Sequence, residues 1–260
     1  MSVSLVRRLG LAYLFSLALA AQTAYDRGAA LLRERRIDEA IAAFEQALQR
    51  SPRSAPALRG LGVAHAYRGD NKLAEEPLRG ACEIDPHDPD GCFYYGLASY
   101  NLGRYDNAIA AYRTALKSSG RAARAHTALG LAYEAASRAA EAEQQLREGV
   151  AKDDGKSLPD SDPRVEFGAF LLRQGRLGEA KAALLDARQD SPRAHFDLGR
   201  ILSQEGKLDE AVARLTKAVS LDPSYTAARL LLGRVYFRLG RAADGERETA
   251  LGRKLSAAKP

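Results

Sequence analysis

Three distant segments of the chain share one order of apolar and polar positions. Each begins with an apolar residue, Asp and a polar residue, continues with Ala and an aliphatic residue, and has a large apolar residue four positions after the Ala. The segments are IDEAIAAFEQAL (37–48), YDNAIAAYRTAL (105–116) and LDEAVARLTKAV (208–219). Self-similarity of this kind predicts an internal structural repeat rather than a single irregular domain.

The repeat has a period of about 34 residues. Small residues mark its phase: Ala40, Ala74, Ala108, Ala142, Ala180, Ala211 and Gly245. A glycine stands twelve positions before each of these: Gly28, Gly62, Gly96, Gly130, Gly168, Gly199 and Gly233. Most of the units are expected to end at a helix-ending residue twelve positions further on: Pro52, Pro86, Gly120, Pro192 and Pro223.

This phased pattern resembles the tetratricopeptide repeat (TPR) family over essentially all of residues 21–257. The resemblance implies an all-α fold, a right-handed superhelical solenoid of about seven antiparallel helix hairpins. It also implies that each Gly on a first helix and each Ala on a second helix is small because the two backbones cross closely. A large apolar residue is expected one turn beyond the Ala: Phe44, Leu78, Tyr112, Leu146, Leu184 and Leu215.

Further glycines are expected at the turns between paired helices, where a residue with positive φ ends the first helix. They are Gly69, Gly103, Gly175, Gly206 and Gly240. The large aromatic residue that the family usually has near the start of each unit is missing. In its place stand Ala24, Leu58, Cys92, His126, Arg164, His195 and Arg229.

The composition agrees with a folded helical chain. Apolar residues make up 46% of the sequence and charged residues 28%, which excludes wholesale disorder. Aromatic residues are only 7%, and two Cys residues are too few for a disulfide-dense scaffold or a multi-Cys zinc module.

The first twenty residues have the order of a secretory signal peptide. Arg7 and Arg8 precede the apolar run LGLAYLFSLALA (9–20), which ends in the small-x-small pattern that signal peptidase needs. The run is too short to span a bilayer. We therefore expect export to the periplasm or the medium after cleavage near Ala20; an amphipathic first helix and an uncleaved anchor are the alternatives.

Irregular spacing predicts a division of the repeat array. The spacing of the Ala positions lengthens to 38 residues around the loop-like segment GKSLPDSDP (155–163) and then shortens to 31. The expected organisation is a signal peptide (1–20), a stack of four hairpins (21–156), a loop or kink (157–160) and a stack of three hairpins (161–257). The polar segment 242–255 suits a solvent-facing cap on the last hairpin.

Motifs of catalysis are missing from the sequence. It has no P-loop, no His-Glu-x-x-His and no Gly-x-Ser-x-Gly, so we expect no enzyme, no cofactor and no metal site. Four aspartates are interpreted as a solvated acidic loop rather than a cation site: Asp153, Asp154, Asp160 and Asp162. Cys82 and Cys92 flank the loop between two helices, so a disulfide is possible in an exported protein, although two reduced, packed thiols are favoured.

TPR arrays bind extended or helical peptides on the face lined by first helices. Carried over from the family, the lining positions are Tyr25, Arg33, Arg59, Tyr67, Phe93, Tyr100, Asn101, Arg124, Glu134, Arg173, Arg193, Phe196, Arg200, Arg234, Phe237 and Arg238. Asp90 and Asp162 complete the acids of this face. Because arginine forks bind carboxylates, the hypothesis is a scaffold for acidic or C-terminal segments of a partner protein; the alternative is that these arginines only keep a helical surface soluble.

Other partners are weighed against this hypothesis. The Lys/Asn clamp of chaperone-binding relatives is not matched, because Tyr25, Ala29, Arg59, Gly60 and Val63 occupy its sites. A nucleic-acid-binding helical repeat is the second hypothesis, since the net charge is +6, but acids are spread through every unit. An accessory subunit of an enzyme or envelope assembly is the third. The sequence predicts neither the partner nor the oligomeric state.

Overall fold

The computed structural model describes residues 20–118, 122–155 and 159–258, and within these residues every regular element is helical. The predicted signal segment lies outside the described residues except for Ala20. The described chain forms two compact units, one ending at Gln145 and the other beginning at Leu146. The predicted division at 157–160 stays a prediction, because residues 156–158 are not described.

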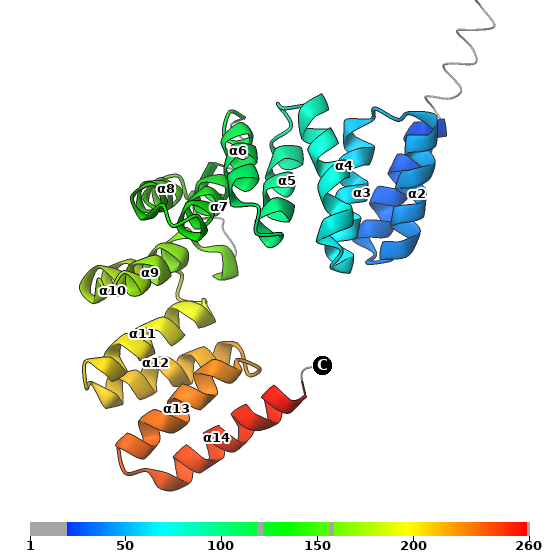
Figure 1. Ribbon diagram of the computed structural model, residues 1–260. Helices are drawn as coiled ribbons and strands as arrows, with labels where there is room; N and C mark the ends of the chain where they lie inside the picture. The colour runs from blue at the N-terminus through cyan, green and yellow to red at the C-terminus, as the bar shows by residue number, and fades with distance from the viewer. Residues whose placement is uncertain (1–19, 119–121, 156–158, 259–260) are drawn as a thin grey trace, which may run out of the picture. The chain divides into compact units, whose positions relative to one another are not determined.

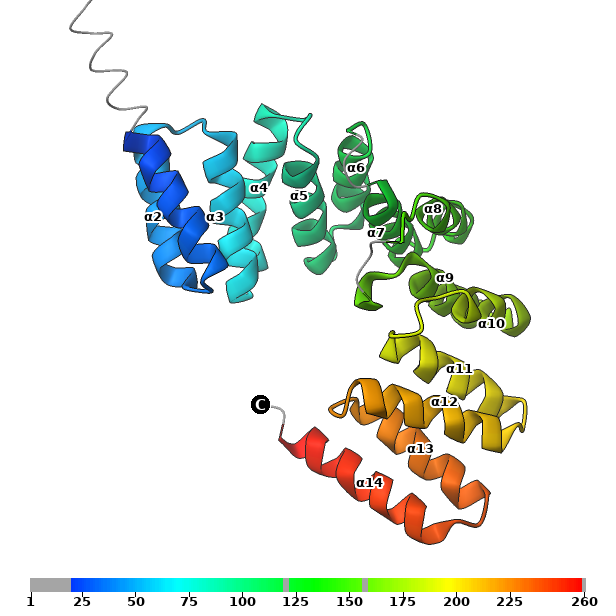
Figure 2. The same cartoon turned by 180° about the vertical axis from the view of Figure 1, so that it is seen from behind.

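The first unit is a series of helical hairpins (Figures 1 and 2). Its helices are residues 20–33, α2 (Ile37–Arg50), α3 (Ala55–Arg68), α4 (Asn71–Ile84), α5 (Pro89–Asn101), α6 (Tyr105–Ala115), α7 (Ala122–Ala135) and the start of α8 (Ala139–Ala151). The second unit contains the end of α8, the short 3₁₀ helix η2 (Pro159–Ser161), α9 (Pro163–Arg173), α10 (Leu177–Leu185), α11 (Pro192–Gln204), α12 (Leu208–Leu221), α13 (Thr226–Arg238) and α14 (Ala242–Ala257). The expected all-α architecture of TPR-like hairpins is confirmed.

Close packing explains the phased small residues. A Cβ atom added to Gly62 of α3 would lie 2.4 Å from Cγ of Leu78 and 3.0 Å from the backbone oxygen of Ala74, both on α4. In the second unit, a Cβ atom on Gly199 of α11 would lie 2.6 Å from Cγ of Leu215 on α12. The two helices of a hairpin therefore approach so closely that only glycine fits opposite the large apolar residue.

The turns within hairpins also follow the prediction. All five turn glycines have positive φ: Gly69 (91°), Gly103 (72°), Gly175 (75°), Gly206 (75°) and Gly240 (72°). Two further hairpins place a residue other than glycine in this region, Arg35 (63°) and Ser137 (60°). A side chain there is disfavoured, because Cβ crowds the backbone.

α5, α9 and α11 each begin with a proline directly after a capping Asp or Ser. In α9 the carboxylate of Asp162 accepts the backbone N–H of Arg164 at 2.9 Å, and Pro163 takes the first helical position. Proline suits this position, because its missing N–H would have no partner inside the helix. Pro192, expected from the repeat phase to end a helix, begins α11 in the same way.

The acidic segment before α9 is not a solvated loop throughout. Asp154 is exposed, but the side chain of Asp153 is only 3% exposed and that of Asp162 is fully buried. The expectations that Asp162 is solvated and that it lines the inner face are wrong. Its carboxylate is needed inside the protein, where it accepts backbone N–H groups from Arg164 (2.9 Å) and Arg188 (2.8 Å).

Candidate binding groove

A hollow in the first unit lies on the face of the first helices. It has a volume of about 710 Å³ and is walled by residues 20–33, α3 and α5. Four predicted binding residues line it: Tyr25, Arg33, Arg59 and Tyr67. The remaining lining residues are Ala29, Leu32, Arg35, Phe44, Pro56, Gly60, Val63, Asp90 and Tyr94. We call this hollow the N-terminal groove.

Phe44 of α2 forms the floor of the groove. Its side chain is 1% exposed, and its ring lies 5.9 Å from the ring of Tyr25, centroid to centroid. Added Cβ atoms on Gly28 and Gly60 would lie 2.8 and 2.5 Å from the Phe44 ring. Because glycine stands on both flanking first helices, the ring fits between them and gives the groove an apolar floor.

At one edge of the groove, the positive charge of Arg59 is compensated by two carboxylates. Nη1 of Arg59 lies 2.7 Å from Oδ2 of Asp88 and 3.9 Å from Oδ2 of Asp90, and all three side chains are about a quarter exposed. Asp88 also caps α5, where it accepts the backbone N–H of Asp90. Arg59 therefore links α3 to the start of α5, and its guanidinium is already paired with carboxylates of the protein.

Arg35 lines the opposite edge of the groove, although the sequence did not predict it as a binding residue. Its guanidinium carbon lies 5.3 Å from the centre of the Tyr67 ring, a cation–π contact. The repeat spacing does mark Arg35 as a turn residue, because it stands one period of 34 residues before the turn glycine Gly69. Leu32 and Tyr94 were also missed; they become groove residues only through the packing of three helices.

Other predicted residues of the first unit lie elsewhere. Phe93 is 3% exposed, packs 5.4 Å from Tyr112, and is covered by the guanidinium of Arg124 at 4.2 Å from its ring centre. Tyr100 contacts the ring of Tyr105 at 5.6 Å, and the exposed Asn101 donates to Asn71 Oδ1 at 3.3 Å. The structure does not bring these four residues into the N-terminal groove.

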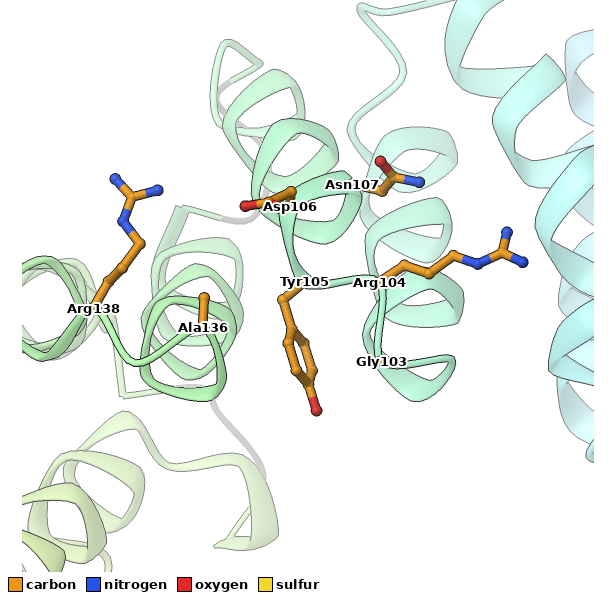
Figure 3. Close-up of a pocket in the computed structure, with 7 residues that line it drawn as sticks. All are labelled: Gly103, Arg104, Tyr105, Asp106, Asn107, Ala136 and Arg138. Carbon is orange, nitrogen blue, oxygen red and sulfur yellow. The ribbon is translucent and has the colours of Figure 1, made fainter.

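A second hollow of about 450 Å³ lies beside the turns of the third and fourth hairpins (Figure 3). Figure 3 shows that the side chains of Arg104 and Arg138 extend away from Tyr105. Arg104 pairs with Glu75, and Arg138 pairs with Glu141 at 2.6 Å. With its cations bound elsewhere, this hollow has no obvious ligand-binding chemistry.

In the second unit, most predicted arginines are bound within the unit. Arg193 forks onto both carboxylate oxygens of Glu166, Arg200 lies 3.1 Å from Asp197, and Arg238 donates to the Ser203 carbonyl at 2.8 Å. The remaining members of the predicted face differ in exposure. Phe196 packs on Tyr225 at 5.1 Å, Phe237 is 46% exposed, and Arg173 and Arg234 are exposed.

Two ionisable groups of this face are perturbed by burial. Desolvation raises the pKa of Asp197 above its ordinary value, although Arg200, Arg193 and Arg173 oppose the change. Burial also raises the pKa of Tyr225 to about 12, and the negative charge of Asp197 adds to the effect. Arg200 of α11 thus pairs with a buried acid, Asp197, and Arg193 of the same helix pairs with Glu166.

Cys82 of α4 and Cys92 of α5 form a disulfide across the loop between the second and third hairpins. Their Cα atoms are 4.6 Å apart. The two cysteines are therefore disulfide-bonded, although reduced thiols were favoured from the sequence. The bond joins the last turn of α4 to the first turn of α5. Two residues of α5, Asp90 and Tyr94, line the N-terminal groove.

The disulfide leads to a direct prediction. Protein purified without reductant and denatured in guanidinium should titrate with no free thiol in Ellman's assay, because the chain contains two Cys residues and both are bonded. After treatment with dithiothreitol the same sample should titrate with two. Two thiols in the untreated sample would show that the bond does not form.

Within residues 20–118, 122–155 and 159–258, no helix combines the length and apolar character needed to cross a membrane. The same residues hold no group of three or more His, Cys, Asp or Glu side chains placed to bind a metal ion.

Sequence profiles of known families agree with this geometry. A profile described as tetratricopeptide repeat matches residues 25–89, 96–157 and 170–213, and a second profile of the same description matches residues 202–254. The chain belongs to the tetratricopeptide repeat family.

Individual relatives of this TPR chain cover only parts of it. The type IV pilus assembly protein PilF of Pseudomonas aeruginosa is 24% identical over 185 residues, which are 68% of this chain and 58% of PilF. The TPR repeat-containing thioredoxin TTL4 of Arabidopsis thaliana is 31% identical over 93 residues, 35% of this chain and 14% of TTL4. The TPR chain therefore spans less than two thirds of these relatives.

Solved structures with the same fold include PilF and PilW, the latter described as a widely conserved type IV pilus biogenesis factor. The P. aeruginosa PilF structure has a TM-score of 0.65 at 19% identity, covering 82% of this chain and 97% of its own. PilW has a TM-score of 0.63 at 22% identity, covering 78% and 93%. A TPR protein from Parabacteroides merdae has a TM-score of 0.69 at 15% identity, covering 93% and 95%. At these identities the likeness shows the shared fold.

Proposed function

We propose that this chain is an exported, non-catalytic scaffold that binds a segment of a partner protein in the N-terminal groove. The observation that carries the proposal is the groove itself. A hollow of about 710 Å³ is walled by three first helices, has charged edges, and has an apolar floor at Phe44 of the second helix α2. Clefts that combine an apolar floor with a few polar groups are the usual form of a binding site.

Tyr67 is the strongest candidate anchor in this groove. Its side chain is 55% exposed although it is large and aromatic. Aromatic side chains contribute much of the free energy at protein interfaces, because they bury a large area at low entropic cost. The second unit offers a further surface for acidic segments through the exposed Arg173 and Arg234.

Export is supported by two independent features. The first is the order of basic residues, apolar run and small residues in 1–20. The second is the Cys82–Cys92 disulfide, since disulfides persist mainly in oxidising compartments. The similarity to PilF over 68% of the chain favours one particular setting: service as an accessory subunit of an envelope assembly.

Peptide selection tests the proposed function. An octapeptide phage library would be selected on the full chain, and the affinity of the best synthetic peptide measured by calorimetry. Tyr67→Ala should weaken binding about tenfold or more, because an interface aromatic is worth about 2 kcal/mol. Its melting temperature should stay near that of the wild type, since the ring is 55% exposed.

Leu73→Ala is the matched control. Leu73 is also 55% exposed, but it lies on the second helix α4 and does not line the groove. This variant should bind the peptide as the wild type does. Equal binding by Tyr67→Ala would contradict the assignment of the groove, and tight RNA binding that falls steeply with salt would favour the nucleic-acid alternative instead.

A further inference from the structure

The turn between the first described helix and α2 has an unusual residue. Arg35 has a φ of 63°, a conformation that five other hairpin turns give to glycine. Residues with a side chain are disfavoured here, and such positions gather at functional sites where the side chain is needed. An arginine at this turn therefore indicates a role for its side chain.

The side chain of Arg35 lies at the edge of the N-terminal groove. Its guanidinium stacks over Tyr67, the exposed aromatic residue of that groove. Arg33 lines the same hollow and is exposed. The turn thus places the guanidinium of Arg35 beside an aromatic anchor, and Arg33, whose Nε donates to the Ala29 carbonyl at 3.2 Å, lines the same groove from the preceding helix.

The acids near this turn are bound by other arginines, and one of them, Asp38, lies 3.2 Å from Nη1 of Arg68. Arg36 lies 3.2 Å from Glu34 and 2.6 Å from Glu39. Within the described part of the chain, neither Arg33 nor Arg35 makes an ion pair. At the far edge of the groove, by contrast, Arg59 is neutralised by Asp88 and Asp90. The uncompensated positive charge of the groove is therefore concentrated where Arg33 and Arg35 lie.

We propose that Arg35, with Arg33, binds the carboxylate of an acidic side chain in the partner segment, and that an apolar side chain beside it packs on Tyr67. The proposal deepens the proposed function and rests on it. A guanidinium fork matches a carboxylate in geometry and in charge. Tyr67, which is 55% exposed, offers the apolar surface for the neighbouring side chain. Arg35 is thus a specificity-determining residue, and this role accounts for a side chain standing where five other hairpin turns have glycine.

The test compares glycine substitutions at two turns. Arg35→Gly removes the guanidinium and leaves a residue that favours positive φ. Ser137→Gly makes the same change at the turn of the fourth hairpin, where φ is 60° and no groove residue is lost. Both variants should melt within a few degrees of the wild type, because other hairpins already have glycine there.

Binding is measured with octapeptides displayed without a free C-terminus and then synthesised with amidated ends, so that side chains are the only carboxylates. We expect the selected peptides to contain Asp or Glu beside an apolar residue. Arg35→Gly should weaken binding tenfold or more, and Ser137→Gly should leave it unchanged. Replacing the peptide Glu by Gln should weaken binding to the wild type but not to Arg35→Gly, as a double-mutant cycle requires for a direct pair.

Several results would overturn the proposal and leave the proposed function intact. These are peptides that depend on Tyr67 but lack an acid, equal affinity of Glu and Gln peptides for the wild type, or peptides that bind only as free C-terminal acids. If no peptide depends on Tyr67, the groove assignment fails and this proposal fails with it. The Glu-to-Gln comparison on the wild type needs no variant and so stands even if Arg35→Gly does not fold.

Discussion

Replacing Phe44 by alanine should lower the free energy of unfolding by about 3–5 kcal/mol. The ring is 1% exposed and lies against Gly28 and Gly60, which have no side chain to fill the space it would leave. The same substitution would remove the floor of the N-terminal groove, so peptide binding should fall with stability. Urea unfolding followed by circular dichroism would measure the loss.

Phe44→Leu provides the graded control. Leucine occupies the corresponding position in four other repeats, at Leu78, Leu146, Leu184 and Leu215, and each of these side chains is no more than 1% exposed. This variant should lose about 1 kcal/mol, as conservative changes of core shape do. A loss below 1 kcal/mol for Phe44→Ala would show that Phe44 does not support the first two hairpins.

Replacing Asp162 by alanine should destabilise the second unit by about 3 kcal/mol or more. The carboxylate is fully buried, caps α9, accepts the backbone N–H of Arg188, and lies 3.3 Å from Nη1 of Arg164. Truncation removes the helix cap and leaves Arg164 and a backbone N–H with fewer partners in a partly buried setting. The midpoint of urea unfolding would report the change.

Asp186→Ala is the control for this prediction. Asp186 binds the same guanidinium through Nε of Arg164 at 3.1 Å, but its side chain is 78% exposed. An exposed ion pair contributes about 0–1 kcal/mol, so this variant should remain close to the wild type. Equal losses in the two variants would mean that burial of Asp162 is not what makes it important.

The sequence was sufficient to predict the hairpins and their internal packing. Gly62 against Leu78 and Gly199 against Leu215 have the contacts that the repeat phase predicted, and all five turn glycines have positive φ. These features recur with the period, because each depends on contacts within one helical hairpin. A local geometry that is repeated leaves the same residue type at the same phase.

The binding face could be predicted only in part. Tyr25, Arg33, Arg59 and Tyr67 do line one groove, but Arg59 is bound to Asp88 and the ring of Phe93 lies beneath Arg124. Several such pairs join residues about one repeat apart, as Arg59 and Asp88 do, 29 positions from each other. The family's lining positions place a side chain on a helix face, but they do not show which neighbouring side chain binds it.

By itself, the sequence determined the repeat and its helical hairpins, since these follow from side-chain size and spacing along one chain. Tertiary structure alone decided that Asp162 is buried, that Cys82 bonds to Cys92, and that Arg35 stacks on Tyr67. Each of these depends on how one hairpin packs against the next. Burial and pairing are properties of neighbours in space, and a periodic pattern specifies the helix face on which a residue lies but not the partner that it meets there.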